Sequence, residues 1–187
     1  LLKDSEVTLT ASPANLALDP DGTAKTNEQG QAIFTATTTV AAKYTLTAQV
    51  SQTNGQVSTK TAESKFVADD KNAELTASSD VQSLVADGKS TAKLEVTLFS
   101  ANNPVGGNVW VDIEAPEGVT EKDYQFLPSK NDHFVSGKIT RTFSTSKPGV
   151  YTFTFNALTY GGYEMKPVTV TITAVDADTA KGEEAMK

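Results

Sequence analysis

Few residues in this chain of 187 could support catalysis. It has no cysteine and a single histidine, His133, which removes thiolate chemistry and leaves one candidate histidine base. A serine hydrolase needs a histidine placed beside its nucleophile, but His133 lies in the polar segment KNDHF, with no Gly-x-Ser-x-Gly turn nearby. We therefore expect His133 to be a solvated loop residue, and we expect the protein not to be an enzyme.

Pairs of carboxylates are the other candidates for chemistry. Asp112 and Glu114 lie two residues apart and share one strand face, whereas a glycosidase needs its two carboxyl groups about 5–10 Å apart across a cleft. We expect both to face solvent, with Val111 and Ile113 turned inward. Acidic pairs that could bind calcium lack the Asp-x-Asp-x-Asp-Gly loop and its closing glutamate, so we expect solvated charges, no metal and no cofactor. These pairs are Asp19 with Asp21, Asp69 with Asp70, and Asp176 with Asp178.

Aromatic side chains are the candidates for contacts with a partner, because exposed aromatic residues frequently anchor protein interfaces. Trp110 alternates with Val109 and Val111, so either the tryptophan or the valines face the core. We expect Trp110 to pack between two sheets, as a central tryptophan does in many sandwiches, and the alternative is an exposed Trp110. The possible partner contacts lie in or beside expected loops: Tyr124, Phe126, Phe134, Tyr160 and Tyr163.

Charge and hydropathy exclude further classes of function. The formal net charge is −7, whereas proteins that bind nucleic acids need a basic surface, so we expect no nucleic-acid partner. No stretch approaches the roughly 20 consecutive apolar residues of a membrane-spanning helix. We therefore expect that this segment is not itself inserted in a membrane.

Apolar and polar residues alternate with a period of two along much of the chain, which is typical of strands with one buried face. Residues 32–36 and 44–50 form two such runs separated by a short break, and we expect them to pair as antiparallel strands. Short strands with turns between them indicate β-sandwiches. Further strands are expected at residues 5–12, 56–67, 73–78, 91–100, 109–114, 137–145, 150–157 and 168–174.

The sequence also repeats itself. YTLT at residues 44–47 aligns with YTFT at 151–154, and VTL at 7–9 aligns with VWV at 109–111. A repeat of this length predicts tandem domains. Only six residues precede Val7, whereas a long segment precedes Val109 in the second module, so we expect the first module to lack its opening strands. The expected divisions are an N-terminally incomplete module at residues 1–70, a complete module at 71–176, and a polar tail or linker at 177–187.

Several motifs resemble the bacterial Ig-like modules of the intimin/invasin family of adhesins. Residues 86–92, ADGKSTA, fit the Ala-Asp-Gly-Lys start of the family pattern, and residues 103–107, NPVGG, fit its Asn-Pro-Val-x-Gly turn. Residues 25–32, KTNEQGQA, fit the Thr-Asp-x-Asn-Gly-x-Ala turn, with asparagine where aspartate is usual and Gln-Gly in place of Asn-Gly. Two segments fit the Gly-x-Tyr-x-Val-x-Ala strand, and the second module departs from the third motif at its segment HFVSG. The two strand segments are AKYTLTA at 42–48 and PGVYTFTF at 148–155.

This resemblance implies a fold, a location and a role. It implies an all-β chain of two tandem Ig-like β-sandwich modules, in a monomeric rod on the bacterial cell surface, anchored to the outer membrane through a part of the protein outside this sequence. The implied function is attachment to a host cell-surface or extracellular-matrix protein, in virulence, as a binding module or a rigid spacer. The alternative is an accessory Ig-like or carbohydrate-binding module of a secreted polysaccharide-degrading enzyme, which predicts a flat row of Trp110, Tyr160 and Tyr163.

Overall fold

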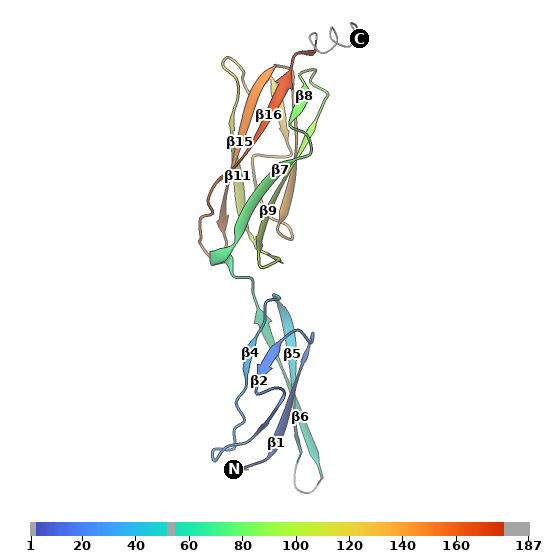
Figure 1. Ribbon diagram of the computed structural model, residues 1–187, viewed down its shortest axis with the longest axis vertical. Coiled ribbons are helices and arrows are strands. Elements are labelled where there is room, and N and C mark those ends of the chain that lie inside the picture. The colour runs from blue at the N-terminus through green and yellow to red at the C-terminus, as the bar shows by residue number, and fades with distance from the viewer. Residues whose placement is uncertain (1–2, 52–54, 178–187) are drawn as a thin grey trace. The chain divides into compact units, whose positions relative to one another are not determined.

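The structure, a computed structural model, describes residues 3–51 and 55–177. Over these ranges the regular structure consists of strands and one short 3-10 helix, η1 (Asp70–Asn72). The chain divides into two compact units, Leu1–Ala68 (unit 1) and Asp69–Lys187 (unit 2), which Figure 1 shows as two groups of strands. The all-β fold predicted from the alternation of apolar and polar residues is therefore confirmed.

Unit 1 is a sandwich of unequal layers. A four-stranded sheet in the order β3-β1-β5-β6 faces the short pair β2-β4, and all of these pairings are antiparallel. The buried side chains of its described residues are Val7, Leu16, Thr26 and Tyr44. Strand β6 lies at the sheet edge and is almost fully exposed, as its polar sequence predicts. The strands are β1 (Glu6–Ser12), β2 (Ala17–Asp19), β3 (Thr23–Lys25), β4 (Thr35–Thr37), β5 (Ala42–Ser51) and β6 (Val57–Phe66).

Asn54-Gly55, between β5 and β6, is a dipeptide typical of hairpin turns, and Asn54 lies outside the described residues. Residues 3–51 and 55–68 contain six strands rather than the seven of a complete Ig-like sandwich. The absence of the opening strands from unit 1 therefore stays a prediction.

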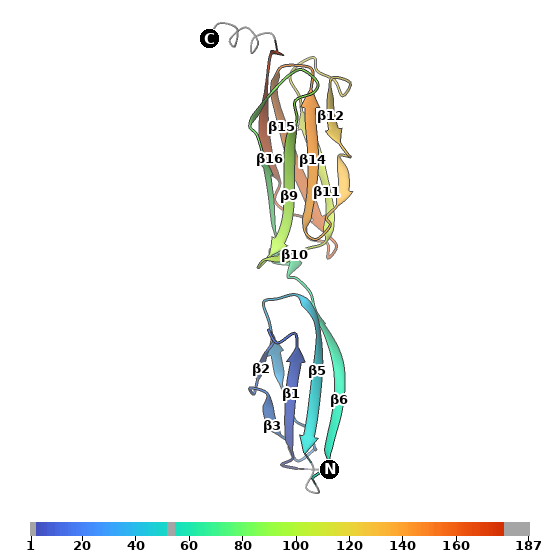
Figure 2. The ribbon, with the colours of Figure 1, turned by 90° about the vertical axis from the view of Figure 1, so that its right-hand side faces the viewer.

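Unit 2 consists of two larger sheets packed face to face. One sheet has the order β10-β9-β14-β12, with β7 also paired to β9, and the other has the order β13-β11-β15-β16-β8. Figure 2 shows β9 and β14 side by side in the first sheet. The strands are β7 (Glu74–Ser79), β8 (Ser83–Val85), β9 (Ala92–Ser100), β10 (Asn103–Pro104), β11 (Gly107–Glu114), β12 (Tyr124–Leu127), β13 (Asn131–His133), β14 (Lys138–Thr145), β15 (Gly149–Thr159) and β16 (Val168–Val175).

One pairing in the described sheets is parallel. After β7 the chain leaves the first sheet, and β8 joins the second sheet beside the C-terminal half of β16. Backbone bonds flank the pair, from Thr173 N–H to Gln82 O at 2.9 Å and from Ala86 N–H to Val175 O at 2.8 Å. The first half of β16 therefore has no strand on that side.

The predicted antiparallel pairing of the two runs at 32–36 and 44–50 is wrong. Strand β4 pairs with β2, whereas β5 lies between β1 and β6 in the other sheet. The equivalent strands of unit 2, β14 and β15, also belong to different sheets. In both units the short connection crosses from one layer to the other, so alternation identified the strands but not their partners.

A buried tyrosine fixes each of these crossings. The hydroxyl of Tyr151 donates to Lys147 O at 2.8 Å and lies 2.6 Å from Thr145 Oγ1. In unit 1 the hydroxyl of Tyr44 donates to Val40 O at 2.8 Å and lies 3.1 Å from Thr38 Oγ1. A tyrosine that bonds back to the chain a few residues upstream, at a corner between sheets, is the tyrosine corner of Ig-like sandwiches.

The core of unit 2 is aromatic. The ring of Phe143 lies 4.9 Å from both Tyr151 and Phe153, and Phe126 stacks on Phe153 at 5.6 Å. These four side chains come from both sheets and are at most 9% exposed. Their packing contributes hydrophobic burial and edge-to-face contacts between rings, and it makes each sheet a rigid support for the side chains on its outer face.

Candidate functional site

The groups considered for catalysis lie on strands β11 and β13 of unit 2 and are exposed. His133 is exposed as expected but lies on strand β13 and not in a loop; its side chain is 61% exposed, and its Nδ1 is 3.3 Å from Asp132 Oδ1. Asp112 and Glu114 are exposed on β11 while Val111 is buried, as the alternation predicts. Within the part of the chain that the structure describes, no three His, Cys, Asp or Glu side chains are grouped to hold a metal.

Of the acidic pairs considered for calcium, Asp19 and Asp21 are both exposed. Asp69 accepts a hydrogen bond from Asn72 Nδ2 at 2.7 Å, and the carboxylate of Asp70 occupies the space where a side chain at Gly161 would lie. The third pair, Asp176 and Asp178, includes a residue outside the described ranges.

An ion pair between a buried arginine and a partly exposed aspartate holds β13 against β14. Arg141 is 4% exposed, and its Nη2 lies 2.5 Å from Asp132 Oδ2, while its Nε donates to Ser129 O at 2.7 Å. The backbone N–H of His133 donates to the Asp132 carboxylate, and with the Arg141 guanidinium it holds the pKa of Asp132 below its usual value. This pair fixes the position of β13, and therefore of the outward-facing residues on either side of Asp132.

The aromatic residues proposed as partner contacts divide into two groups. Phe126 and Phe134 are 9% and 5% exposed, so they belong to the core and offer no surface to a partner. Tyr124 is half-buried against Phe143 and Tyr151. Tyr160 and Tyr163, which are 66% and 42% exposed, keep their rings accessible at the turn after β15.

Trp110 does not pack between the sheets, and that prediction is wrong. Val109 and Val111 are 2% and 5% exposed and therefore face the core. The alternation of a strand then places Trp110 on the outer face of the second sheet, where it is half-buried.

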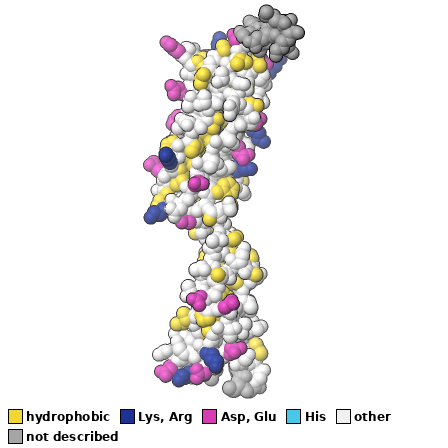
Figure 3. Space-filling model, in the orientation of Figure 1, with side chains coloured by type: hydrophobic (Ala, Val, Ile, Leu, Met, Phe, Trp, Pro, Cys, Tyr) yellow, Lys and Arg dark blue, Asp and Glu magenta, His cyan; other side chains and the backbone are white. Residues whose placement is uncertain are grey.

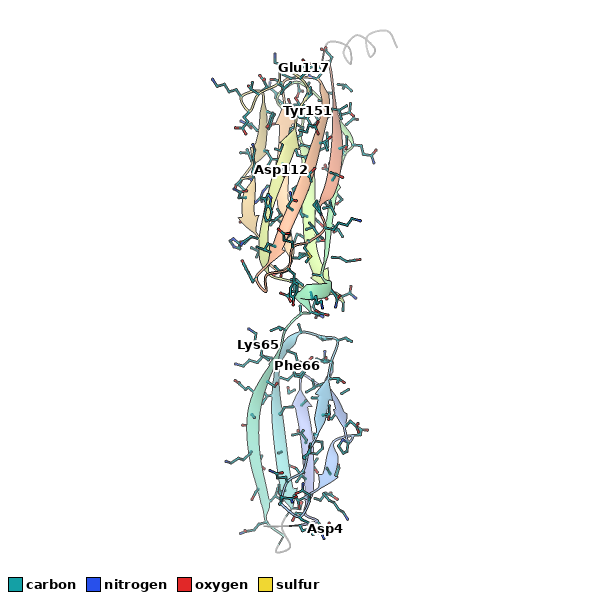
Figure 4. All side chains as sticks on the ribbon, turned by 90° about the vertical axis from the view of Figure 1, so that its left-hand side faces the viewer. Asp4, Lys65, Phe66, Asp112, Glu117 and Tyr151 are labelled. Carbon is teal, nitrogen blue, oxygen red and sulfur yellow. The ribbon has the colours of Figure 1, made fainter. Side chains whose placement is uncertain are left out.

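Residues that lie directly opposite each other on paired strands point to the same face of a sheet. Trp110 is opposite Asn131 of β13 on one side and Asn156 of β15 on the other. Asn108 and Asp112 share its face along β11, and Asn156 Nδ2 donates to Asp112 Oδ2 at 3.3 Å. We call these residues the Trp110 face: Asn108, Trp110, Asp112, Asn131 and Asn156. Figure 4 views the molecule from this side of unit 2, with Asp112 labelled.

The ring of Tyr160 lies at one end of the Trp110 face. Its backbone N–H donates to Gly106 O at 3.1 Å, and a Cβ at residue 106 would be 2.8 Å from Cδ2 of the Tyr160 ring. Gly106 is two residues before Asn108 and so points to the same side of the sheet. The absence of a side chain at Gly106 leaves the space in which the tyrosine ring lies.

A separate apolar groove of about 420 Å³ runs between β7 and the start of β16. Figure 3 shows hydrophobic side chains in a diagonal band over this part of unit 2. Its walls carry apolar side chains together with Glu74, Thr76 and Lys166; the apolar ones include Leu75, Met165, Pro167 and Val168. Because no further strand pairs with β7 on its outer side or with the first half of β16, the groove opens between two sheet edges.

Known structures resemble the chain over most of its length, although no family model and no curated protein sequence matches it. InvD from Yersinia pseudotuberculosis matches with a TM-score of 0.52 and 14% identity, covering 94% of this chain and 48% of that one. FdeC, an Escherichia coli adhesin, matches with a TM-score of 0.51 and 17% identity, covering 94% and 53%. The chain has the Ig-like fold of intimin/invasin-type adhesin modules.

Intimin and invasin structures are also matched at lower TM-scores, and this chain spans about half of the solved InvD and FdeC chains. A β-glycosidase from Bacteroides vulgatus matches with a TM-score of 0.46 and 12% identity, covering 90% of this chain and 21% of that one. At 14% and 17% identity, the matches to InvD and FdeC show the fold alone. No helix in the described ranges is long and apolar enough to cross a membrane.

Proposed function

We propose that this chain is an extracellular segment of an intimin/invasin-like adhesin that takes part in attachment to host cells or matrix. The observation that carries this proposal is the likeness to the adhesin FdeC over 94% of the chain. The motifs quoted above support it, and so do the two Ig-like units. In this proposal the protein acts as a monomer at the bacterial surface, anchored to the outer membrane by a part outside this sequence, and its activity is binding and not catalysis.

Within this role, we propose a binding module rather than a spacer alone. A spacer needs only a polar, unfeatured surface, because its task is to hold other domains at a distance. Unit 2 instead presents the exposed rings of Tyr160 and Tyr163, the half-buried Trp110 on the outer face of a sheet, and the largely apolar groove beside β7. Exposed aromatic and apolar side chains of this kind are features of interaction sites.

Attachment is tested by measuring saturable binding of the fluorescently labelled chain to epithelial cells and to immobilised matrix proteins. We expect saturable binding, which the Trp110→Ala and Tyr160→Ala substitutions weaken. The matched control is Leu127→Ala, which removes a side chain that is 51% exposed on the other sheet and is expected to leave binding unchanged. The absence of saturable binding to every surface would contradict the attachment role.

One observation favours a second candidate function, an accessory module of a polysaccharide-degrading enzyme. Trp110 and the Tyr160 ring lie on the same outer face of unit 2, as a sugar-stacking row requires. This candidate predicts that the chain sediments with insoluble cellulose or xylan and does not bind cells.

A further inference from the structure

We infer that the Trp110 face of unit 2 is a binding site for uncharged pyranose sugars of cell-surface glycans. This inference rests on the attachment role proposed above and names the chemistry of the partner. It is carried by the kinds of side chain that the strand register brings together, by their orientation, and by the charge of the face.

The aromatic part of the site matches the apolar side of a sugar ring. A pyranose carries C–H groups on one or both of its flat sides, and these pack on the face of an indole. Trp110 is half-buried on the outer face of the second sheet, so part of its side chain is covered by the protein and part is open to solvent. An aromatic ring fixed before binding loses little conformational entropy when a ligand stacks on it.

The polar part matches the sugar hydroxyls. A carboxamide offers two N–H donors and a carbonyl acceptor, and a hydroxyl group both donates and accepts. Asn131 and Asn156 lie directly opposite Trp110 on the two neighbouring strands, so hydrogen-bonding groups are present on both sides of the indole. The bond from Asn156 Nδ2 to Asp112 Oδ2 orients that amide and leaves the second Asp112 oxygen to accept from a hydroxyl.

The charge of the site favours uncharged sugars. Asp112 belongs to the Trp110 face, Glu114 follows it on the same side of β11, and both are exposed. The chain as a whole has a formal net charge of −7. Lys130 interacts with Asp112 but is itself paired with Glu121, so the carboxylates of Asp112 and Glu114 keep this face acidic. A sialylated or sulfated sugar stacked on Trp110 would meet like charge there, whereas a neutral hexose would not.

Tyr160 extends the site beyond a single sugar ring. Asn156, opposite Trp110, and Tyr160 are four residues apart, a separation of about 13 Å along the strand direction. Asn108 and Leu158 lie opposite each other between these two positions. The face is therefore long enough for a short oligosaccharide with rings stacked at both ends, and Gly106 provides the space that keeps Tyr160 in this position.

The test uses the single tryptophan of the chain as a reporter located in the proposed site. The whole chain is titrated with lactose, with cellotetraose and with sialyllactose, while Trp110 emission and the amide side-chain NMR signals are recorded. We expect saturable changes with lactose at millimolar concentrations, including shifts of the Asn131 and Asn156 signals, and at least a severalfold weaker response to sialyllactose.

Variants separate stacking from hydrogen bonding. We expect Trp110→Ala to weaken lactose binding about tenfold or more, as judged by NMR. We expect Asn131→Ala to weaken lactose binding severalfold, and Trp110 emission can still be used to measure binding by this variant. Gly106→Ala displaces the Tyr160 ring and is expected to affect longer oligosaccharides more than lactose. Leu127→Ala is the control and should bind all of these sugars unchanged.

Four outcomes would overturn the inference. One is an unchanged Trp110 and amide spectrum with every neutral sugar, and another is a response that Trp110→Ala does not reduce. A response to cellotetraose alone would assign the face to polysaccharide chains instead of cell-surface glycans. Cell binding that survives Trp110→Ala and enzymatic removal of surface glycans would refute the sugar site and leave the attachment role standing, whereas absence of cell binding would refute the attachment role.

Discussion

Replacing Tyr151 by alanine is expected to destabilise unit 2 by about 4 kcal/mol, which is typical of removing a buried aromatic ring. Tyr151 is fully buried and contacts Phe143 at 4.9 Å, so the substitution leaves a cavity in the middle of the aromatic core. Tyr151→Phe keeps the ring and removes the hydroxyl bonds to Lys147 and Thr145, at an expected cost of about 1–2 kcal/mol.

Urea denaturation followed by Trp110 emission measures both variants, because the only tryptophan lies in unit 2 and reports on its unfolding. Val150→Ala, which removes an exposed neighbouring side chain, is the matched control and should change the midpoint little. Equal midpoints for Tyr151→Phe and the parent chain would show that the hydroxyl does not stabilise the crossing between sheets.

The Tyr151 hydroxyl also gives unit 2 a dependence on alkaline pH. Burial raises the pKa of Tyr151 above its usual value, so the folded state prefers the neutral hydroxyl. The stability associated with this group is fully present below the pKa of an unfolded tyrosine, about 10, and is lost as the pH rises through the folded value. Tyr151→Phe is expected to remove this part of the alkaline loss.

Removing the carboxylate of Asp132 is the second change with a large expected effect. Asp132→Ala leaves the guanidinium of Arg141 buried without its ion-pair partner. Loss of one member of a fully buried pair costs about 3–5 kcal/mol, and we expect about 2 kcal/mol here because the Asp132 side chain is 33% exposed and Arg141 keeps its bonds to Ser129 and Thr140.

The double variant Asp132→Ala/Arg141→Leu distinguishes an unpaired charge from lost packing. It removes the buried charge together with its partner, so it is expected to be more stable than Asp132→Ala alone. If the double variant is less stable than the single one, the guanidinium contributes mainly through its packing and its backbone bonds.

The same pair predicts a response to acid. The pKa of Asp132 is lowered in the folded protein, so its contribution to stability is present above the pKa of an unfolded aspartate, about 4, and is lost as the pH falls through the lower folded value. The parent chain should therefore lose more stability below pH 4 than Asp132→Ala does, as measured by urea midpoints across this range.

The strands of this fold were largely predictable, and their partners were not. Alternation located β9, β11, β14, β15 and β16, because each has a buried face and an exposed one. It missed short strands such as β8 and β13, each of three residues, since a period of two needs more residues to stand out. It also paired β4 with β5, because nothing in the local pattern shows that the chain crosses between layers.

The candidate site shows the same limit. The sequence correctly placed Asp112 toward solvent, and Trp110 shares the parity of Asp112 on β11. The prediction of a buried Trp110 gave more weight to residue type than to that shared parity. Asn131 and Asn156 carry no local signal at all, because they become neighbours of Trp110 only through the register of three strands.

The parallel pairing of β8 with β16 has a mechanical consequence for unit 2. Tension applied between Asp69 and Val175 pulls β8 and β16 in opposite directions along their common axis, because they run parallel and lead to opposite ends of the unit. Their hydrogen bonds, including those from Thr173 to Gln82 and from Ala86 to Val175, are loaded together in shear. An antiparallel hairpin that is pulled open from its free ends breaks its hydrogen bonds one after another. The hydrogen bonds between β8 and β16 share the load and must break together.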